Sequence, residues 1–520
     1  MTTNGQQFYR FSEAPIWELQ RAYFEEKGMK AWEDDEVPQY ITSNPMIAEA
    51  YAEMIFGFLQ DRAAQGHVSE PVTILELGAG AGRLAFHIVR QLREIRNYAG
   101  LTLPPVRYVM SDLAAKNVAS WQRHPGLLSL VDEGLLDFAR FDAVNDTELH
   151  LTQSKVVIRP GDLEQPLLVI ANYFFCSIPQ ELLYVDEGKI FECEVALKFP
   201  EEVEGLSQSE LLKKVVPEFQ YRRAASYEED THPYQGVIQI YQDKLEDSHI
   251  LFPAAGLMCM ERLNALSQAG FLLITADKGD HRLENWEFAP PPELIHHGCF
   301  SLTANYHAIQ HAFEQKGAVS LFTQHHYKDI NAGCILMLQE PASYVQTRLA
   351  YRRFIDRFGP DDFYCLKGSV DQHLGEMELR QLLAFWRLGG YDAELFIHSA
   401  EHISALLQDC GDEELLDLQR GIQIMWANHY AMEASYDLAL DCGLLLFEMD
   451  QFAQAREFLE RSVLANPDEP VVPVLYSLAI CNYELGDEAA TLDYTTRALE
   501  LEPEYEEALE LLNALKQGVE

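Results

Sequence analysis

Three glycines at alternate positions, Gly78, Gly80 and Gly82, follow a short apolar run that carries one acid, Glu76, in the stretch ILELGAGAGRL. A glycine-rich turn lets a ligand approach the backbone closely, and a helix that begins after it offers free N–H groups. The fingerprint of dinucleotide-binding folds needs a further glycine at position 83, where the residue is Arg83. The loop is therefore a cradle for some other ligand, a variant dinucleotide site, or only a tight turn.

Two further acids follow the next strand-like segments. Asp112 ends the segment 106–112 (VRYVMSD), thirty residues after Gly82, and Asp142 lies at the end of the third strand-like segment, in RFDAV. A carboxylate at position 112 can accept two hydrogen bonds from ribose hydroxyls, and such charge-assisted bonds are strong. Because parallel strands bind ligands at their carboxyl ends, we expect both acids to lie beside the glycine loop.

The spacing E-x-G-x-G-x-G resembles motif I of class I S-adenosylmethionine-dependent methyltransferases. The resemblance implies S-adenosyl-L-methionine as cofactor, with the glycines making room for its methionine and ribose portions. It implies that Asp112 binds the ribose and that Asp142 contacts the adenine amino group. The cofactor-binding residues expected on this basis are Glu76, Gly78, Ala79, Gly80, Gly82, Asp112, Leu113, Asp142, Ala143 and Asn172.

A fourth strand-like segment, LLVIANYFFCSIPQELL over 167–183, resembles the MidA-like methyltransferases, which include mitochondrial complex I assembly enzymes that methylate protein arginine. That family reads A-N-E-F-F-D-A-L-P here. Further stretches that resemble the family within 8–340 are YITSNPMIAEAYAE, GFLLITADKG and GCFSLTANYHAI. Tyr173 stands where the family has glutamate, and Cys176 where it has aspartate. Those acids would bind or deprotonate a guanidinium, so arginine specificity does not carry over to this chain.

Methyl transfer needs alignment, desolvation and at most one proton acceptor near the nucleophile. The candidate catalytic residues are Asn172, whose amide oxygen could hold a nucleophilic N–H, Tyr173, which could orient a substrate, and Glu181, the nearest acid that could act as a base. We expect a methyltransferase acting on a protein side chain. The alternatives are a non-catalytic adaptor that binds the cofactor and a small-molecule methyltransferase.

Alternating strand and helix patterns place these residues in an α/β domain with a Rossmann-like, doubly wound sheet of seven strands, the last antiparallel. We expect a helical region over 1–70, the methyltransferase domain over 71–340 with an insertion at about 184–235, and an α-helical domain over 341–520. Asn44 or Ser43 is expected to cap a helix that starts at Pro45.

Near the end of the chain, Pro467 and Pro503 lie 36 positions apart in two similar segments. These segments resemble tetratricopeptide repeats over about 436–515, with small residues at Gly443, Ala455 and Ala479 where paired helices approach. The resemblance implies protein–protein interaction, and we expect the repeats to help recruit the substrate.

The net charge of −43 on 520 residues disfavours nucleic acid as a partner and favours a basic protein or peptide. Nine scattered cysteines, no signal peptide and no membrane-length apolar run predict a cytoplasmic protein that does not bind a membrane. Neighbouring histidines such as His325 and His326 point to opposite faces of a strand, and no ligand spacing such as HExxH occurs, so we expect no metal. The oligomeric state stays open.

Overall fold

The computed structural model describes residues 7–34, 36–199, 205–224, 227, 232–297, 299–432, 436–466 and 471–517. The chain forms two compact units, Met1–Leu366 and Lys367–Glu520. None of the helices described is both long and apolar enough to cross a bilayer.

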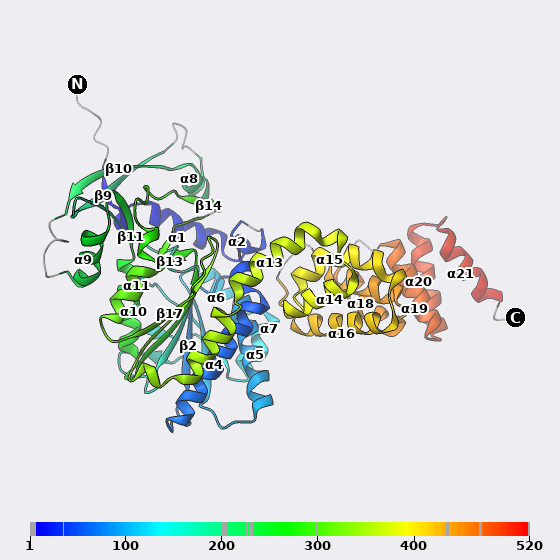
Figure 1. Ribbon diagram of the computed structural model, residues 1–520. Helices are drawn as coiled ribbons and strands as arrows, with labels where there is room; N and C mark the ends of the chain where they lie inside the picture. The colour runs from blue at the N-terminus through cyan, green and yellow to red at the C-terminus, as the bar shows by residue number, and fades with distance from the viewer. Residues whose placement is uncertain are drawn as a thin grey trace. The chain divides into compact units, whose positions relative to one another are not determined.

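A seven-stranded mixed sheet forms the centre of the first unit, as predicted (Figure 1). Numbered along the chain, its strands lie in the order 6-7-5-4-1-2-3, and only the seventh runs antiparallel to its neighbours. The first strand is buried at all six positions, which suits a sheet covered on both faces. In chain order the strands are β2 (Val72–Leu77), β3 (Val106–Asp112), β4 (Leu136–Arg140), β7 (Leu167–Asn172), β12 (Gly270–Asp277), β17 (Val319–Phe322) and β18 (Asn331–Leu338).

Helices cover both faces of this sheet (Figure 1). The helix that leads into the first strand begins as predicted, because the Asn44 side chain accepts a hydrogen bond from the Ile47 N–H at 3.0 Å and Pro45 occupies the first turn. On one face lie α4 (Pro45–Ala64), α5 (Arg83–Ala99) and α7 (Pro125–Asp132), and on the other α10 (Ala254–Leu266) and α11 (Tyr306–Glu314).

The predicted insertion belongs to a second, antiparallel sheet that also contains strands from before and after the insertion. It recruits Tyr9–Arg10 from the beginning of the chain, which pair with Glu194 and Val195. A strand that follows the insertion also joins it, because Ser248–Phe252 pairs with the strand that begins at Glu181. The strands are β1 (Tyr9–Arg10), β8 (Glu181–Asp186), β9 (Lys189–Lys198), β10 (Val216–Arg223) and β11 (Ser248–Phe252).

The first unit continues past the boundary expected at 340. Asp61 of α4 accepts hydrogen bonds from the backbone N–H groups of Gln346 and Thr347, at 3.0 and 2.8 Å, and from the Thr347 hydroxyl at 2.8 Å. A Cβ on Gly57 would lie 2.8 Å from the Gln346 carbonyl oxygen, so glycine allows α12 (Val345–Tyr351) to approach α4 closely. These contacts hold the segment after 340 against the sheet domain.

The second unit is helical in all its described secondary structure. The small residues expected at helix contacts have this role, since a Cβ on Gly443 would meet the Leu459 side chain at 2.6 Å and Ala455 and Ala479 are fully buried. Helices that are neighbours along the chain pack in pairs, α17 with α18 and α19 with α20. Its helices are α14 (Leu379–Leu388), α15 (Ala393–Leu406), α16 (Asp412–Asn428), α17 (Leu438–Glu448), α18 (Phe452–Ala465), α19 (Val472–Glu484), α20 (Glu488–Leu501) and α21 (Glu506–Gln517).

Candidate functional site

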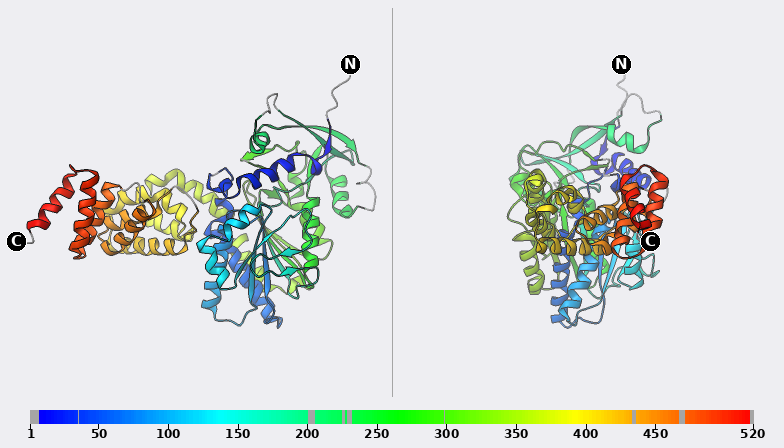
Figure 2. Two further views of the ribbon diagram at one scale, coloured as in Figure 1. Left: turned by 180° about the vertical axis from the view of Figure 1, so that it is seen from behind. Right: turned by 90° about the vertical axis from the view of Figure 1, so that its right-hand side faces the viewer.

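A cavity of about 470 Å³ opens at the carboxyl ends of β2, β3 and β7. Its volume lies in the range of small-molecule and cofactor sites, and its position is the one where such sheets bind ligands. Segments before the sheet close it from one side, chiefly α1 (Ile16–Lys27), which runs across the same end of the sheet in Figures 1 and 2. The cavity therefore combines the glycine loop with a wall that comes from the first forty or so residues.

The glycine loop has the conformation that its sequence requires. Gly78 and Gly80 have φ angles of 62° and 53°, in the left-handed region that favours glycine. A Cβ on Gly78 would meet only the Phe174 ring, at 3.9 Å, so the backbone borders open space at this point. The loop returns to the sheet through a hydrogen bond from the Ala79 N–H to the Ser111 carbonyl, at 2.9 Å. The predicted residues Gly78, Ala79, Gly80 and Gly82 all line the cavity.

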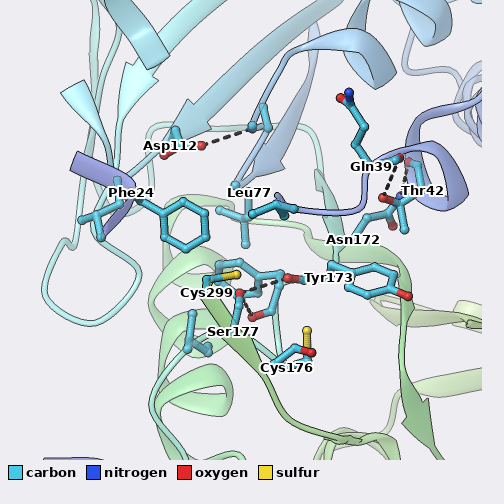
Figure 3. A pocket seen from close by; sticks show the side chains of 18 of the residues that line it. Phe24, Gln39, Thr42, Leu77, Asp112, Asn172, Tyr173, Cys176, Ser177 and Cys299 are labelled. Atoms are coloured by element: carbon cyan, nitrogen blue, oxygen red, sulfur yellow. Dashed lines mark hydrogen bonds between the residues drawn. The ribbon is translucent and has the colours of Figure 1, made fainter. Parts of the chain in front are cut away.

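Asp112 lines the cavity beside this loop (Figure 3). One carboxylate oxygen accepts a hydrogen bond from the Gly80 N–H at 3.1 Å, and the other accepts one from the Ala114 N–H at 2.8 Å. Burial raises the pKa of Asp112 to about 6, and the donors of Ala114, of the Asn117 side chain and of Gly80 oppose the rise. A carboxylate has about four acceptor positions, so the oxygens keep capacity for a ligand diol. Leu113, next to it, also lines the cavity.

Glu76 lines the cavity from within β2 and is 4% exposed. Burial raises its pKa to about 8, while a hydrogen bond from the Tyr108 hydroxyl, at 2.9 Å, opposes the rise. The carboxyl group is therefore mostly protonated at neutral pH and can donate a hydrogen bond as well as accept one.

Asp142 lines the cavity with Ala143, but its carboxylate already has partners in the protein. Arg21 of α1 forms an ion pair with it at 2.8 Å, and the Asn145 side chain and the Val144 N–H donate at 2.9 Å each. Burial alone would raise the pKa of Asp142, but the Arg21 guanidinium and these donors lower it to about 2. An adenine amino group that binds to Asp142, as expected, would have to share the carboxylate with these donors or displace one of them.

Asn172 ends β7 at the cavity, and its amide group is engaged by the protein. The side-chain oxygen accepts hydrogen bonds from the Tyr51 hydroxyl at 2.7 Å and from the Ala276 N–H at 3.0 Å. The side-chain nitrogen donates to the Thr42 carbonyl at 3.3 Å (Figure 3). The hypothesis that the amide oxygen holds a nucleophilic N–H has to be corrected, because both acceptor positions of this oxygen are taken.

Tyr173 lines the cavity, with a φ of 46° that is unusual for a residue other than glycine. Its hydroxyl donates to the Asp329 carbonyl at 2.7 Å, and in Figure 3 its ring points away from Asp112. Burial raises the pKa of Tyr173 well above the usual value, so the hydroxyl stays protonated at neutral pH and no tyrosinate is available as a base. Its contact to the cavity is the ring rather than a free hydroxyl.

Glu181 is not among the residues that line this cavity, and its interpretation as a base here has to be corrected. It begins β8 in the second sheet, where it forms an ion pair with Arg10 at 3.3 Å and accepts a hydrogen bond from the Ser12 hydroxyl at 2.9 Å. The pairing of β8 with β11 and the recruitment of residues 9–10 turn this side chain toward the second sheet.

An acid from β12 lies against the position where the MidA-like family has aspartate. Asp277 is fully buried and accepts a hydrogen bond from the Cys176 N–H at 3.1 Å, while Cys176 itself lines the cavity. Burial raises the pKa of Asp277 to about 7. The sequence signal for Asp277 is the same as for Asp112, an acid at the end of a buried strand, although no motif role is predicted for it above.

One side of the cavity is formed by side chains from the first forty residues, and no sequence pattern predicts it. Phe24 and Trp32 line the cavity with stacked rings whose centroids are 5.9 Å apart. A Cβ on Gly80 would lie 3.0 Å from the Trp32 ring, so this ring lies directly on the glycine loop. No local pattern could reveal it, because the contact joins residues almost fifty positions apart.

Comparison with known proteins leaves the function open. No family model matches the chain, and no curated protein matches it. Two solved protein structures from Burkholderia thailandensis resemble this chain, each at 14% sequence identity. One is an uncharacterized ACR, COG1565 superfamily protein that covers 65% of this chain and 90% of its own, with a TM-score of 0.41. The other is a COG1565 superfamily member bound to S-adenosyl-homocysteine, which covers 66% and 91%, with a TM-score of 0.42. Likeness at this level assigns no function, so a function has to be argued from the cavity.

Proposed function

We propose that this chain binds S-adenosyl-L-methionine in the 470 Å³ cavity and transfers its methyl group to an acceptor. One observation carries the proposal: the left-handed glycine loop and the Asp112 carboxylate line the same cavity at the carboxyl edge of a seven-stranded sheet. The last strand of that sheet runs antiparallel to its neighbours, as the alternation of strand and helix patterns predicts.

The residues present suit this cofactor. The space over Gly78 admits the methionine and ribose portions, and Asp112 has acceptor positions left for the two ribose hydroxyls. Leu113 and Ala143 offer apolar contact for the base. The cofactor supplies an electrophilic methyl group on a positively charged sulfonium.

The residues of this chain contribute orientation and exclusion of water. Phe24 and Trp32 cover the glycine loop with aromatic surface, which desolvates the centre of the cavity. Asn172 ties the end of β7 to Tyr51 and β12 and so fixes the wall at which an acceptor would be aligned. Asn172 and Tyr173 offer no free proton acceptor, and Glu181 does not line the cavity, so the methyl acceptor has to lose its proton to water or to another group.

The acceptor that we propose is a side chain of a basic protein or peptide, recruited partly by the tetratricopeptide-like second unit in the cytoplasm. Residues 367–520 contain 31 acidic and 8 basic residues, a charge that favours cationic partners and disfavours nucleic acid. A small-molecule acceptor is the competing possibility within the same reaction class.

A second candidate function is a cofactor-binding adaptor without turnover. Two observations favour it: the polar groups of Asn172 and Tyr173 bond to partners inside the protein, and Glu181 does not line the cavity. Under this hypothesis the glycine loop still binds the cofactor, and the helical unit carries the biological activity.

Calorimetric titration with S-adenosylmethionine and with S-adenosylhomocysteine tests the cofactor proposal. We expect binding with one site per chain, and an affinity about 100-fold lower in Asp112→Ala, which is about 2.7 kcal/mol for two hydrogen bonds to a carboxylate. The matched control is Asp329→Ala, because Asp329 lines the far side of the same cavity. Absence of heat with both ligands, or equal losses in the two variants, would contradict both candidate functions.

Transfer of a radioactive methyl group to proteins of a cell lysate separates the two candidates. We expect labelled protein bands that disappear with Asp112→Ala. Binding without any labelled protein or small molecule would favour the adaptor.

A further inference from the structure

Two neighbouring histidines in the segment between β17 and β18 reach different carboxylates. His326 lies 3.3 Å from the Asp280 carboxylate, measured from its Nε2 atom. His325 Nε2 lies 2.7 Å from Asp361 Oδ2 and 4.0 Å from Asp362 Oδ2. Asp361 and Asp362 stand in the first turn of α13 (Pro360–His373), more than thirty positions further along the chain. The tertiary structure thus assembles one imidazole and two carboxylates that no sequence spacing would suggest.

We propose that His325, Asp361 and Asp362 bind a divalent transition-metal ion. Their ligand atoms all lie within 4.8 Å of one another. A tetrahedral zinc site with bonds of about 2.0–2.2 Å places neighbouring ligand atoms about 3.3 Å apart. The two separations measured from His325 Nε2, 2.7 and 4.0 Å, lie on either side of this value, and no pair of the three ligand atoms is more than 4.8 Å apart, so side-chain rotation would have to bring them to equal distances around the ion. A mixed set of one imidazole and two carboxylates suits zinc or manganese better than magnesium or calcium.

The charge of the cluster favours a divalent cation. Asp361 is 1% exposed, and among the described residues neither carboxylate forms an ion pair with a lysine or an arginine. A protonated His325 would balance only one of the two negative charges, whereas a divalent ion balances both. Buried carboxylates without such compensation are costly.

The carboxylates are also oriented as metal ligands commonly are, by donors behind them. The Tyr327 hydroxyl donates to Asp362 Oδ1 at 3.0 Å, and the Gly359 N–H donates to Asp362 Oδ2 at 3.1 Å. The Asp362 N–H donates to Asp361 Oδ1 at 3.0 Å, which leaves Asp361 Oδ2 facing the imidazole. The His325 and Asp362 side chains are 31% and 23% exposed, so an ion can enter and water can complete its coordination.

A bound ion would join two segments that form a wall of the cavity. Tyr364 follows Asp362 by two positions, Asp329 follows Tyr327 by two positions, and both line the cavity. The Asp329 carbonyl accepts the hydrogen bond from Tyr173. Occupancy of the metal site would therefore stiffen the acceptor side of the cavity without touching the glycine loop.

The test is a calorimetric titration of the full chain, freed of metal with a chelator, with ZnCl₂ and separately with MnCl₂. We expect one saturable site per chain, and an affinity at least tenfold lower in His325→Gln and in Asp362→Asn. The matched control is His326→Gln, which alters the neighbouring imidazole that faces Asp280 and should bind as the wild type does. Titration with CoCl₂ should add visible absorption bands to the wild type and not to His325→Gln.

Zinc can also bind weakly to other histidines and cysteines, so the difference between the two histidine variants decides the outcome. Equal affinities of His325→Gln and His326→Gln, or no saturable site in the wild type, would overturn the proposal. Melting curves without metal show whether each variant is folded, and Asp362→Asn provides the test if His325→Gln is not. No readout involves S-adenosylmethionine, so the metal site and the proposed function can fail separately.

Discussion

The polar groups on the two sides of the cavity differ in how far their hydrogen-bonding capacity is used within the protein. On the glycine-loop side, Asp112 accepts one backbone hydrogen bond at each oxygen and keeps acceptor positions for a ligand. On the β7 side, Asn172 and Tyr173 use their polar groups to join strands and loops of the protein itself. Both sides carry residues that a motif would assign to a reaction, but only the first has groups free to serve a ligand.

Binding of a ligand and catalysis of a reaction therefore place different demands on the residues of this cavity. A cofactor cradle requires open space and unsatisfied acceptors, which glycines and a strand-end carboxylate provide. A reactive centre requires a free base or a free hydrogen-bonding group; Asn172 and Tyr173 provide neither, and Glu181 does not line the cavity.

Asn172→Ala should destabilise the protein by about 2–4 kcal/mol, because the buried Tyr51 hydroxyl and the Ala276 N–H both lose their acceptor. Urea denaturation measures the free energy of unfolding. We expect the affinity for S-adenosylmethionine to change less than threefold in the folded variant. If Asn172→Ala were as stable as the wild type but no longer bound S-adenosylmethionine, the β7 side would serve the ligand as the glycine-loop side does, and the contrast would be wrong.

Gly80→Ala should cost about 1–2 kcal/mol for the left-handed backbone and should in addition displace Trp32, which lies 3.0 Å from the added Cβ. Gly78→Ala is the matched control, since it has a similar φ and its Cβ would meet only Phe174 at 3.9 Å. We expect Gly80→Ala to be the more destabilised of the two in thermal melting. In a Trp32→Ala background the two glycine substitutions should destabilise the protein equally. If Gly80→Ala were still the more destabilising, contact with Trp32 would not be the cause.

The affinity for S-adenosylmethionine should fall about tenfold between pH 7 and pH 5, because protonation of Asp112 through its pKa of about 6 removes the acceptor. The stability of the unliganded protein should respond in the opposite sense. The pKa of Asp112 is raised above its unfolded value of 3.8, so its contribution is present below about pH 4 and is lost as the pH rises through 6.

Asp112→Asn is the control for both pH profiles. Titration calorimetry and urea denaturation from pH 5 to pH 8 should show a flatter dependence in this variant than in the wild type. Parallel profiles for the two proteins would mean that another titratable group, and not Asp112, causes the pH dependence.

Tyr173→Phe should have the smallest effect, about 1 kcal/mol or less in stability, because it removes one hydrogen bond to the Asp329 carbonyl. Cofactor affinity should be unchanged, and any methyl-transfer rate should fall less than tenfold. A loss of 100-fold or more would show that the hydroxyl serves the reaction directly.

The features that local sequence predicts well are those with local causes. The apolar runs of β2, β3 and β7 predict buried strands, and Asn44 before Pro45 predicts the start of α4. The glycine loop follows from its own composition, because left-handed backbone angles favour glycine. Asp112 was predictable for the same kind of reason, since the end of a parallel strand determines where its side chain lies.

The partners of those side chains were decided only by the tertiary structure. Asn172 meets Tyr51, and Asp142 meets Arg21, each across 121 positions of the chain, and Glu181 meets Ser12 across 169. Hydrophobic periodicity indicates which face of an element is buried, but it carries no information on which distant polar group will face a given side chain. Local sequence therefore accounts for the sheet, the glycine loop and the Asp112 side of the cavity. The long-range packing of the early helices and of the second sheet determined which of the predicted groups remain free to act.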